Sequence, residues 1–153
     1  MAPPSQRQVV ATNRNARFEY HIGDVYEAGI VLTGTEVKSL RTGKANIKDA
    51  YGLISDNEAW LINSHIDEYK QGNRHNHNPT RHRKLLLHKS EIRKLIGVLK
   101  TSGVTMIPLN MYFNEHGKVK LEIGVATGKK KFEKREAIKD RDWKREQSRL
   151  LKQ

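Results

Sequence analysis

The last part of the chain, residues 129–153, cannot contribute to a hydrophobic core. It holds eleven Lys or Arg and five Asp or Glu, but only six apolar residues. Burial of so few apolar side chains cannot offset the conformational entropy that the segment would lose on folding. We therefore expect a basic tail that is disordered when free. Acid–base pairs such as Asp140 with Lys144 favour a helix, which we expect to form inside a polyanionic groove. The fold must therefore be built from residues 1–128.

The whole chain is strongly basic, with a formal net charge of +12 and a pI near 10.0. Such a surplus attracts nucleic acid or an anionic membrane in a salt-dependent manner. A membrane is less favoured, because no apolar run approaches the ~20 residues of a spanning helix and residues 1–11 lack the apolar stretch of a signal peptide. We therefore expect a cytoplasmic protein. The chain has no cysteine, which excludes disulfides and thiolate metal sites.

In the first half of the chain, apolar and polar residues alternate as they do along β-strands. Residues 1–8 are polar and are expected to be flexible, and a short strand follows at 9–11. Apolar alternation from Phe18 to Leu32 predicts a long strand, interrupted near Gly23-Asp24 or Gly29. Thr35 is the expected N-cap of a short helix that ends at Gly43.

The second half continues this pattern around one helix. Residues 47–66 predict a hairpin that turns at Asp56-Asn57, and residues 69–84 predict an exposed basic loop. Ser90 is the expected N-cap of a helix that ends near Gly103, and residues 107–113 and 119–125 predict a closing hairpin. Short antiparallel strands around one core predict a mainly β fold, an oligonucleotide-binding-like antiparallel barrel over residues 9–128 with one inserted helix.

The usual signatures of catalysis are absent from the sequence. There is no Gly-rich phosphate loop, nucleophile elbow or helical pair of metal-binding histidines. His75, His77 and His82 could bind a metal, but a positively charged loop repels divalent cations, so an RNA-facing polar loop is the favoured reading. Glu27 and Glu36 are more consistent with a salt bridge or a helix cap than with catalysis. We therefore expect no cofactor and no enzymatic activity.

Lysine and arginine side chains predict a phosphate-binding surface on the folded part. Lys38, Arg41 and Lys44 cluster around the short helix, and Lys118 and Lys120 fall on the outer side of a strand. If Glu27 faces RNA, its carboxylate can only accept hydrogen bonds, so it would read base amino groups or a 2′-hydroxyl, or hold an Arg in place. In the tail, Phe132 and Trp143 are aromatic side chains suited to stacking on bases.

Several blocks of sequence together resemble one family. These are Asn13-Arg14-Asn15-Ala16-Arg17-Phe18-Glu19-Tyr20, Glu27-Ala28-Gly29, Gly34-Thr35-Glu36-Val37-Lys38-Ser39-Leu40-Arg41, Gly43-Lys44-Ala45-Asn46, Arg81-His82-Arg83-Lys84-Leu85-Leu86-Leu87, Ile123-Gly124-Val125-Ala126 and Ile138-Lys139-Asp140-Arg141-Asp142-Trp143-Lys144-Arg145. The combination resembles the SmpB family of bacterial tmRNA-binding (SsrA-binding) proteins, from about residue 9 to the end.

The resemblance implies a barrel that binds the tRNA-like domain of tmRNA. It also implies a tail that enters the vacant decoding centre and mRNA channel of the small subunit of a stalled ribosome, so that alanyl-tmRNA, delivered with elongation factor Tu, is accommodated. The process is trans-translation. By motif position, the implied tmRNA-binding residues are Glu27, Leu86 and Lys120, with Lys38, Arg41, Lys44 and Asn46 as neighbours. The implied ribosome-binding residues are Lys129, Lys130, Phe132, Glu133, Lys134, Arg135, Ile138, Trp143 and Lys144.

Two other hypotheses remain open at this point. A generic single-stranded RNA-binding or ribosome-associated barrel would show little preference for tmRNA over another RNA of equal length. A metal-dependent nuclease built on the histidine loop would cleave RNA in a reaction that EDTA stops.

Overall fold

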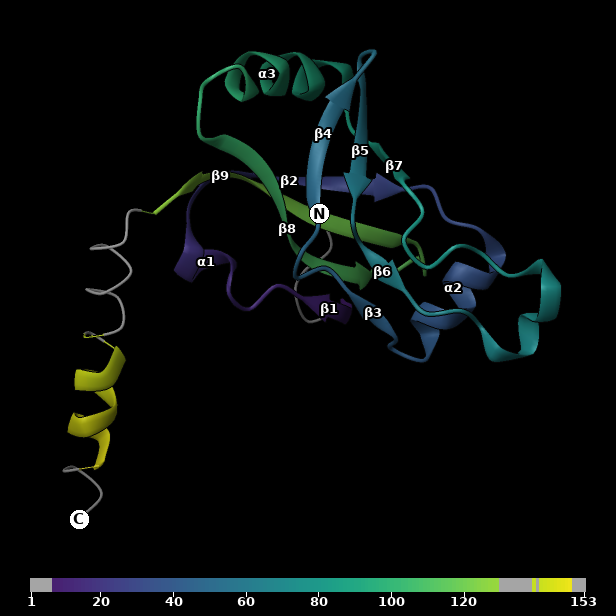
Figure 1. The fold of residues 1–153 in the computed structure, drawn as a ribbon, viewed down its shortest axis with the longest axis horizontal. Helices are drawn as coiled ribbons and strands as arrows, with labels where there is room; N and C mark the ends of the chain where they lie inside the picture. Colours follow the sequence, from purple (N-terminus) through teal and green to yellow (C-terminus); the bar gives the residue numbers. More distant parts are fainter. Residues whose placement is uncertain (1–6, 130–138, 140, 150–153) are drawn as a thin grey trace.

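The computed structural model describes residues 7–129, 139 and 141–149 (Figure 1). The elements, in chain order, are β1 (Gln8–Thr12), α1 (Ala16–Glu19), β2 (Tyr20–Ile30), α2 (Gly34–Arg41), β3 (Ala45–Asn46), β4 (Tyr51–Ser55), β5 (Glu58–Ile62), β6 (His65–Ile66), the 3₁₀ turn η2 (Lys70–His75), β7 (Arg83–Leu86), α3 (Lys89–Leu99), β8 (Val104–Phe113) and β9 (Val119–Gly128). Residues 141–149 form a further helix, which lies apart from the barrel in Figure 1. None of the described helices combines the length and the apolar character of a membrane span.

Six strands close into an antiparallel barrel. The large sheet has the order β1-β8-β4-β5-β7-β2-β9, and β9 also pairs with β8, so the ring from β8 to β9 has no free edge. The join between β4 and β8 rests on the pair Gly52 and Met106. A Cβ atom at Gly52 would lie 3.0 Å from the Met106 Cβ, so glycine permits this close approach. The predicted mainly β barrel with one helix before the last hairpin is confirmed.

The predicted interruption of the long strand is a bulge. The register of β2 against β9 shifts between Ile22 and Val25, at the Gly23-Asp24 site, and β2 continues unbroken through Gly29. The strand begins later than predicted, because Phe18 belongs to the single turn of α1. A bulge increases the local twist and bend of a strand, which helps β2 to follow the curve of the barrel.

Both long hairpins form where the sequence predicts them. β4 and β5 turn at Asp56 and Asn57, whose φ angles of 52° and 62° match the left-handed region that Asx residues tolerate. β8 and β9 turn through residues 114–118, where Gly117 has a φ of 73°. The Asn114 N–H donates to the Lys118 carbonyl at 2.9 Å and closes this loop.

The two predicted helix caps were each displaced by two residues. The N-cap of α2 is Thr33 rather than Thr35, and the Thr33 N–H donates to Glu36 Oε1 at 2.8 Å. The N-cap of α3 is His88 rather than Ser90, and the His88 N–H donates to Glu91 Oε1 at 3.0 Å. In both cases the glutamate three residues after the cap selects the start of the helix.

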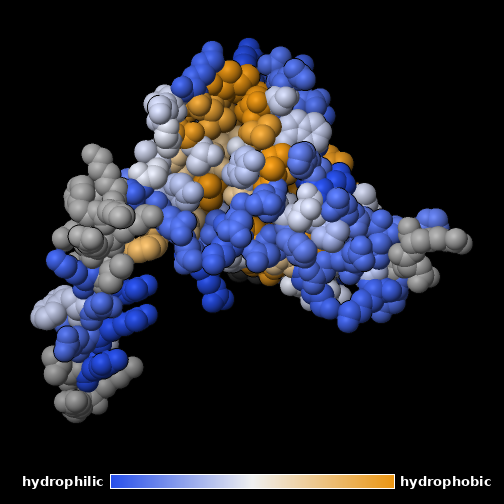
Figure 2. Space-filling view, viewed as in Figure 1, coloured by the Kyte–Doolittle hydropathy of each residue, from blue (hydrophilic) through white to orange (hydrophobic). Residues whose placement is uncertain are grey.

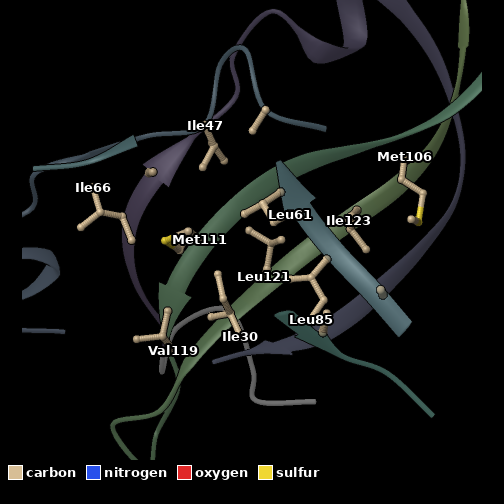
Figure 3. Packing of buried hydrophobic residues seen from close by; sticks show 14 of the residues in the cluster. Ile30, Ile47, Leu61, Ile66, Leu85, Met106, Met111, Val119, Leu121 and Ile123 are labelled. Carbon is tan, nitrogen blue, oxygen red and sulfur yellow. The ribbon is translucent and has the colours of Figure 1, made fainter. Parts of the chain in front are cut away.

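The core fills the inside of the barrel. Figure 3 shows apolar side chains from many strands converging, among them Leu61, Leu85 and Leu121. Val119, Leu121 and Ile123 of β9 point inward while Lys120 and Glu122 between them do not, as the alternation predicts. The inner row of β9 therefore fixes which face its charged residues present.

The predicted basic loop is not uniformly exposed. Arg83 begins β7 and is completely buried, and His77 is also buried. The His77 imidazole lies 2.9 Å from Thr35 Oγ1 through Nδ1 and 2.9 Å from the Ile66 carbonyl oxygen through Nε2. The carbonyl can only accept, so Nε2 donates this hydrogen bond. This histidine ties the loop to α2 and β6.

Candidate nucleic-acid interface

Strand register brings three predicted RNA-binding residues to one outer face. Gly29 of β2 pairs with Leu86 of β7 on one side and with Lys120 of β9 on the other. Lys120 in turn pairs with Tyr112 of β8. We call Leu86, Gly29 and Lys120 the outer row; Tyr112 itself is fully buried. Glu27 lies two residues before Gly29 on the same strand, so its side chain emerges on the same face.

Leu86 is an exposed member of this row. On the sequence alone it would be assigned to the core, but its exposed fraction is 54%, whereas the neighbouring Leu85 is 1% exposed and lies in the core. The missing side chain at Gly29 makes room for it, because a Cβ atom there would lie 3.2 Å from Leu86 Cβ. An apolar side chain this exposed, beside a lysine, is suited to contact with a base or a ribose.

A shallow hollow of about 310 Å³ adjoins the outer row. Its lining includes Leu86, Lys118 and Lys120, together with Val37 of α2. The hollow thus joins the two β9 lysines to α2 through Val37, whereas Lys38, Arg41 and Lys44 do not line it. The face in Figure 2 is mostly hydrophilic, with an apolar area near α3 and β4. The groove between these two elements shares no lining residue with this hollow.

The Glu27 carboxylate holds an arginine, one of the two roles expected for it. The Tyr112 hydroxyl donates to Glu27 Oε2, and Arg7 Nη2 lies 3.8 Å from the same oxygen. Arg7 also pairs with Glu122 through Nη1, and its guanidinium lies 4.4 Å from the centre of the Tyr112 ring. Burial raises the pKa of the Tyr112 hydroxyl, as do the hydrogen bond to Glu27 and its charge.

The other predicted cations lie on and after α2. Lys38, Arg41 and Lys44 are exposed, and Lys38 Nζ lies 5.8 Å from the centre of the Tyr69 ring. Asn46, on β3, lines a different hollow from the outer row, which it shares with Arg14 and Lys48.

A buried ion-pair cluster anchors α2 to the barrel. The Glu36 and Arg83 side chains are both 0% exposed and approach to 2.5 Å, and Arg81 Nη2 donates to Glu36 Oε1 at 2.6 Å. Arg83 also donates to the Ser64 hydroxyl at 2.9 Å. Burial raises the pKa of Glu36, but the hydrogen bonds from Arg81 and Thr33 and the charge of Arg83 outweigh it, so the pKa lies below 4.5. Glu36 therefore forms a salt bridge with Arg83 and also caps α2 by accepting from the Thr33 N–H, the two roles that the sequence suggested.

The histidines do not form a metal site. His77 uses both ring nitrogens for contacts within the protein. Among the residues that the structure describes, no group of three or more His, Cys, Asp or Glu side chains is placed to hold a metal ion.

Part of the predicted ribosome-binding tail is described. Lys129 donates its backbone N–H to the Glu19 carbonyl at 3.0 Å, and Trp143 and Lys144 lie on the helix at 141–149 with Trp143 60% exposed. Arg141, Lys144, Arg145 and Arg149 share one hollow along this helix with Ser148. Trp143 lies on the opposite side by helical spacing. Lys130, Phe132, Glu133, Lys134, Arg135 and Ile138 lie outside the described residues.

Sequence reasoning missed Arg7, Tyr112 and Arg83. Arg7 falls in the segment expected to be flexible, and Tyr112 lies on the outer face of a strand whose neighbours are core residues. Arg83 reads as one more cation in a basic loop. For Arg83, the one sequence signal was Glu36, an acidic residue in a strongly basic chain that needs a positively charged partner.

Comparison with known proteins agrees with the fold and the motifs. The model of the SmpB protein family matches residues 10–153. An SsrA-binding protein of Agrobacterium fabrum is 58% identical over 99% of this chain and 98% of its own length. The SsrA-binding protein of Afipia carboxidovorans is also 58% identical, over 95% of this chain and 92% of its own length. A solved chain from work on tmRNA and SmpB at the center of the bacterial ribosome is 45% identical. That chain aligns over 83% of this chain and 92% of its own length, with a TM-score of 0.67. From this match over nearly its whole length, the chain belongs to the SmpB family.

Proposed function

We propose that this protein binds the tRNA-like domain of tmRNA and enables trans-translation on stalled ribosomes. The observation that carries the proposal is the outer row, in which Leu86 and Lys120 flank Gly29 with Glu27 beside them. Near-full-length relatives are SsrA-binding proteins, and the similar solved chain comes from work on tmRNA and SmpB at the ribosome. Its role is that of an RNA-binding factor rather than an enzyme.

The division of labour that we propose has two parts. The barrel, residues 9–128, contacts tmRNA through Glu27, Leu86 and Lys120, supported by Lys38, Arg41, Lys44 and Asn46. The tail, residues 129–153, contacts the small subunit at the decoding centre and mRNA channel. The basic stripe of Arg141, Lys144, Arg145 and Arg149 supports this assignment, because a helix with cations along one side fits a channel lined with RNA phosphates.

Delivery of alanyl-tmRNA with elongation factor Tu belongs to the same proposal. The protein would then hold the tRNA-like domain while the tail occupies the place of a codon–anticodon helix. Phe132, Glu133, Lys134 and Arg135 are the proposed contacts at the decoding centre, with Lys129, Lys130, Ile138 and Trp143 along the path.

Replacing Lys120 with alanine is expected to weaken binding to the tRNA-like domain. If the ammonium group contacts a phosphate, the slope of log affinity against log salt falls by about one unit, and affinity falls about tenfold. Titration of labelled tRNA-like domain at several salt concentrations measures both. Lys94→Ala is the matched control, because Lys94 is exposed on α3.

The control separates two readings of the result. A loss confined to Lys120→Ala supports a defined RNA surface on the barrel. Equal losses for Lys120→Ala and Lys94→Ala would instead mean that total charge drives binding, as in a generic RNA-binding barrel.

A further inference from the structure

Two carboxylates face each other on the outer side of the barrel. Glu27 of β2 and Glu122 of β9 are direct partners in the register, which places their Cβ atoms about 5 Å apart. Like charges in this position destabilise a sheet, and they repel a polyanion that approaches the same face. Lys120, two residues before Glu122 on the same strand, is a proposed phosphate contact. The carboxylate pair, Glu27 and Glu122, therefore needs compensation if RNA is to bind here.

Arg7 supplies a positive charge between the two carboxylates. Its Nη1 pairs with Glu122 and its Nη2 lies 3.8 Å from Glu27, while the guanidinium is stacked 4.4 Å from the Tyr112 ring centre. The Arg7 side chain is 9% exposed, against 24% for Glu27 and 19% for Glu122. The arginine is thus more buried than either partner, and both carboxylate side chains keep part of their surface exposed.

The contacts of Arg7 point to a role for its charge. Among the described residues, Arg7 Nε and Nη2 are buried and have no hydrogen-bond partner, so this guanidinium does not use its full set of donors there. A residue placed only for stability would be expected to satisfy them. A buried positive charge next to two carboxylates instead lowers the negative potential that a phosphate would meet at Lys120.

From this geometry we infer that Arg7 is a positioning residue of the RNA-binding face, which holds Glu27 in place and offsets one of the two negative charges of the carboxylate pair. This inference rests on the proposed function, because it assumes that RNA binds at the outer row. It adds to that surface a residue from the segment before β1. The charge of Arg7 acts electrostatically on the phosphate backbone of the tRNA-like domain.

The test is a rescue experiment on the full-length protein. Arg7→Ala is expected to weaken binding to the tRNA-like domain about tenfold, because two uncompensated negative charges, instead of one, then lie near the bound phosphates. Adding Glu122→Gln removes one of these charges, which returns the cluster to its net charge in the wild type, and is expected to restore affinity to within about twofold of the wild type. Arg7→Lys keeps the charge and is expected to lose less than Arg7→Ala. Thermal unfolding of each variant identifies any loss that comes from the fold.

Two outcomes would overturn the inference. Unchanged or tighter binding by Arg7→Ala would mean that Arg7 is dispensable or covers Glu27, and failure of Glu122→Gln to rescue would mean that Arg7 acts through the fold alone. Either result is separable from failure of the proposed function. If the proposed function itself failed, the wild type would not prefer the tRNA-like domain, and Lys120→Ala would bind as its Lys94→Ala control does.

Discussion

A chain that ends at Gly128 is expected to bind the tRNA-like domain nearly as well as the full protein but to support no tagging of stalled nascent chains. The barrel is complete before the tail begins, because β8 and β9 close it and every described residue of the core cluster precedes residue 129. The contact described at the junction is the bond from the Lys129 N–H to the Glu19 carbonyl. Losing the charge of the tail should cost affinity only through its salt-dependent part.

Two measurements check this division. Affinity for the tRNA-like domain is measured by titration, and tagging is measured in a reconstituted translation reaction stalled on an mRNA without a stop codon. The matched control carries residues 129–153 in shuffled order, which keeps length and net charge. We expect it to bind RNA as the wild type does and still fail in tagging. Loss of RNA binding together with tagging in the truncated chain would contradict the two-part account.

Replacing Glu36 with glutamine is expected to produce the largest loss of stability among single substitutions of charged residues. The change leaves Arg83 buried without its counter-charge, which costs about 3–5 kcal/mol in comparable buried pairs. Glu58→Gln is the control, since the Glu58–Lys84 pair is about half-exposed and such pairs contribute about 0–1 kcal/mol. Denaturant unfolding measures both free energies, and similar losses for the two variants would exclude Arg83 as the cause.

The stability difference at Glu36 should also depend on pH. The pKa of Glu36 in the folded protein lies below its ordinary value of 4.5, so the folded state favours the charged form. Its contribution is therefore fully present above about pH 4.5 and is lost as the pH falls through the lowered pKa. The difference in unfolding free energy between wild type and Glu36→Gln is expected to be constant at neutral pH and to shrink below pH 4.5.

Local pattern was enough to predict most of the barrel. Alternation placed the inner row of β9, and Asp56-Asn57 and Gly117 marked two turns whose backbone favours those residues. The helix caps were displaced because each N-cap lies three residues before a glutamate. Thr33 precedes Glu36 and His88 precedes Glu91, and these positions won over the predicted caps two residues later. Arg83 was misjudged for a different reason. Its burial depends on Glu36, which is far away in sequence and is brought close only by the folding of α2 onto the barrel.

The candidate site was predictable in part. Lys120 follows from alternation alone, whereas Glu27 and Leu86 were assigned through the family resemblance. Leu86 reads as core, and only the pairing of β7 with β2 reveals that it lies over Gly29 on the outside. Arg7 could not be predicted, because its partners Glu27, Tyr112 and Glu122 come together only when β1, β8, β9 and β2 are side by side.

The most direct test of the central claim is site-specific photo-crosslinking to tmRNA from position 86, with a photoreactive amino acid in place of Leu86. Position 98 is the control, because Val98 is 41% exposed on α3, away from the outer row. We expect crosslinks from position 86 that map to the tRNA-like domain, and few from position 98. Crosslinks of equal yield from both positions, or crosslinks from position 98 alone, would contradict a specific RNA-binding surface at the outer row.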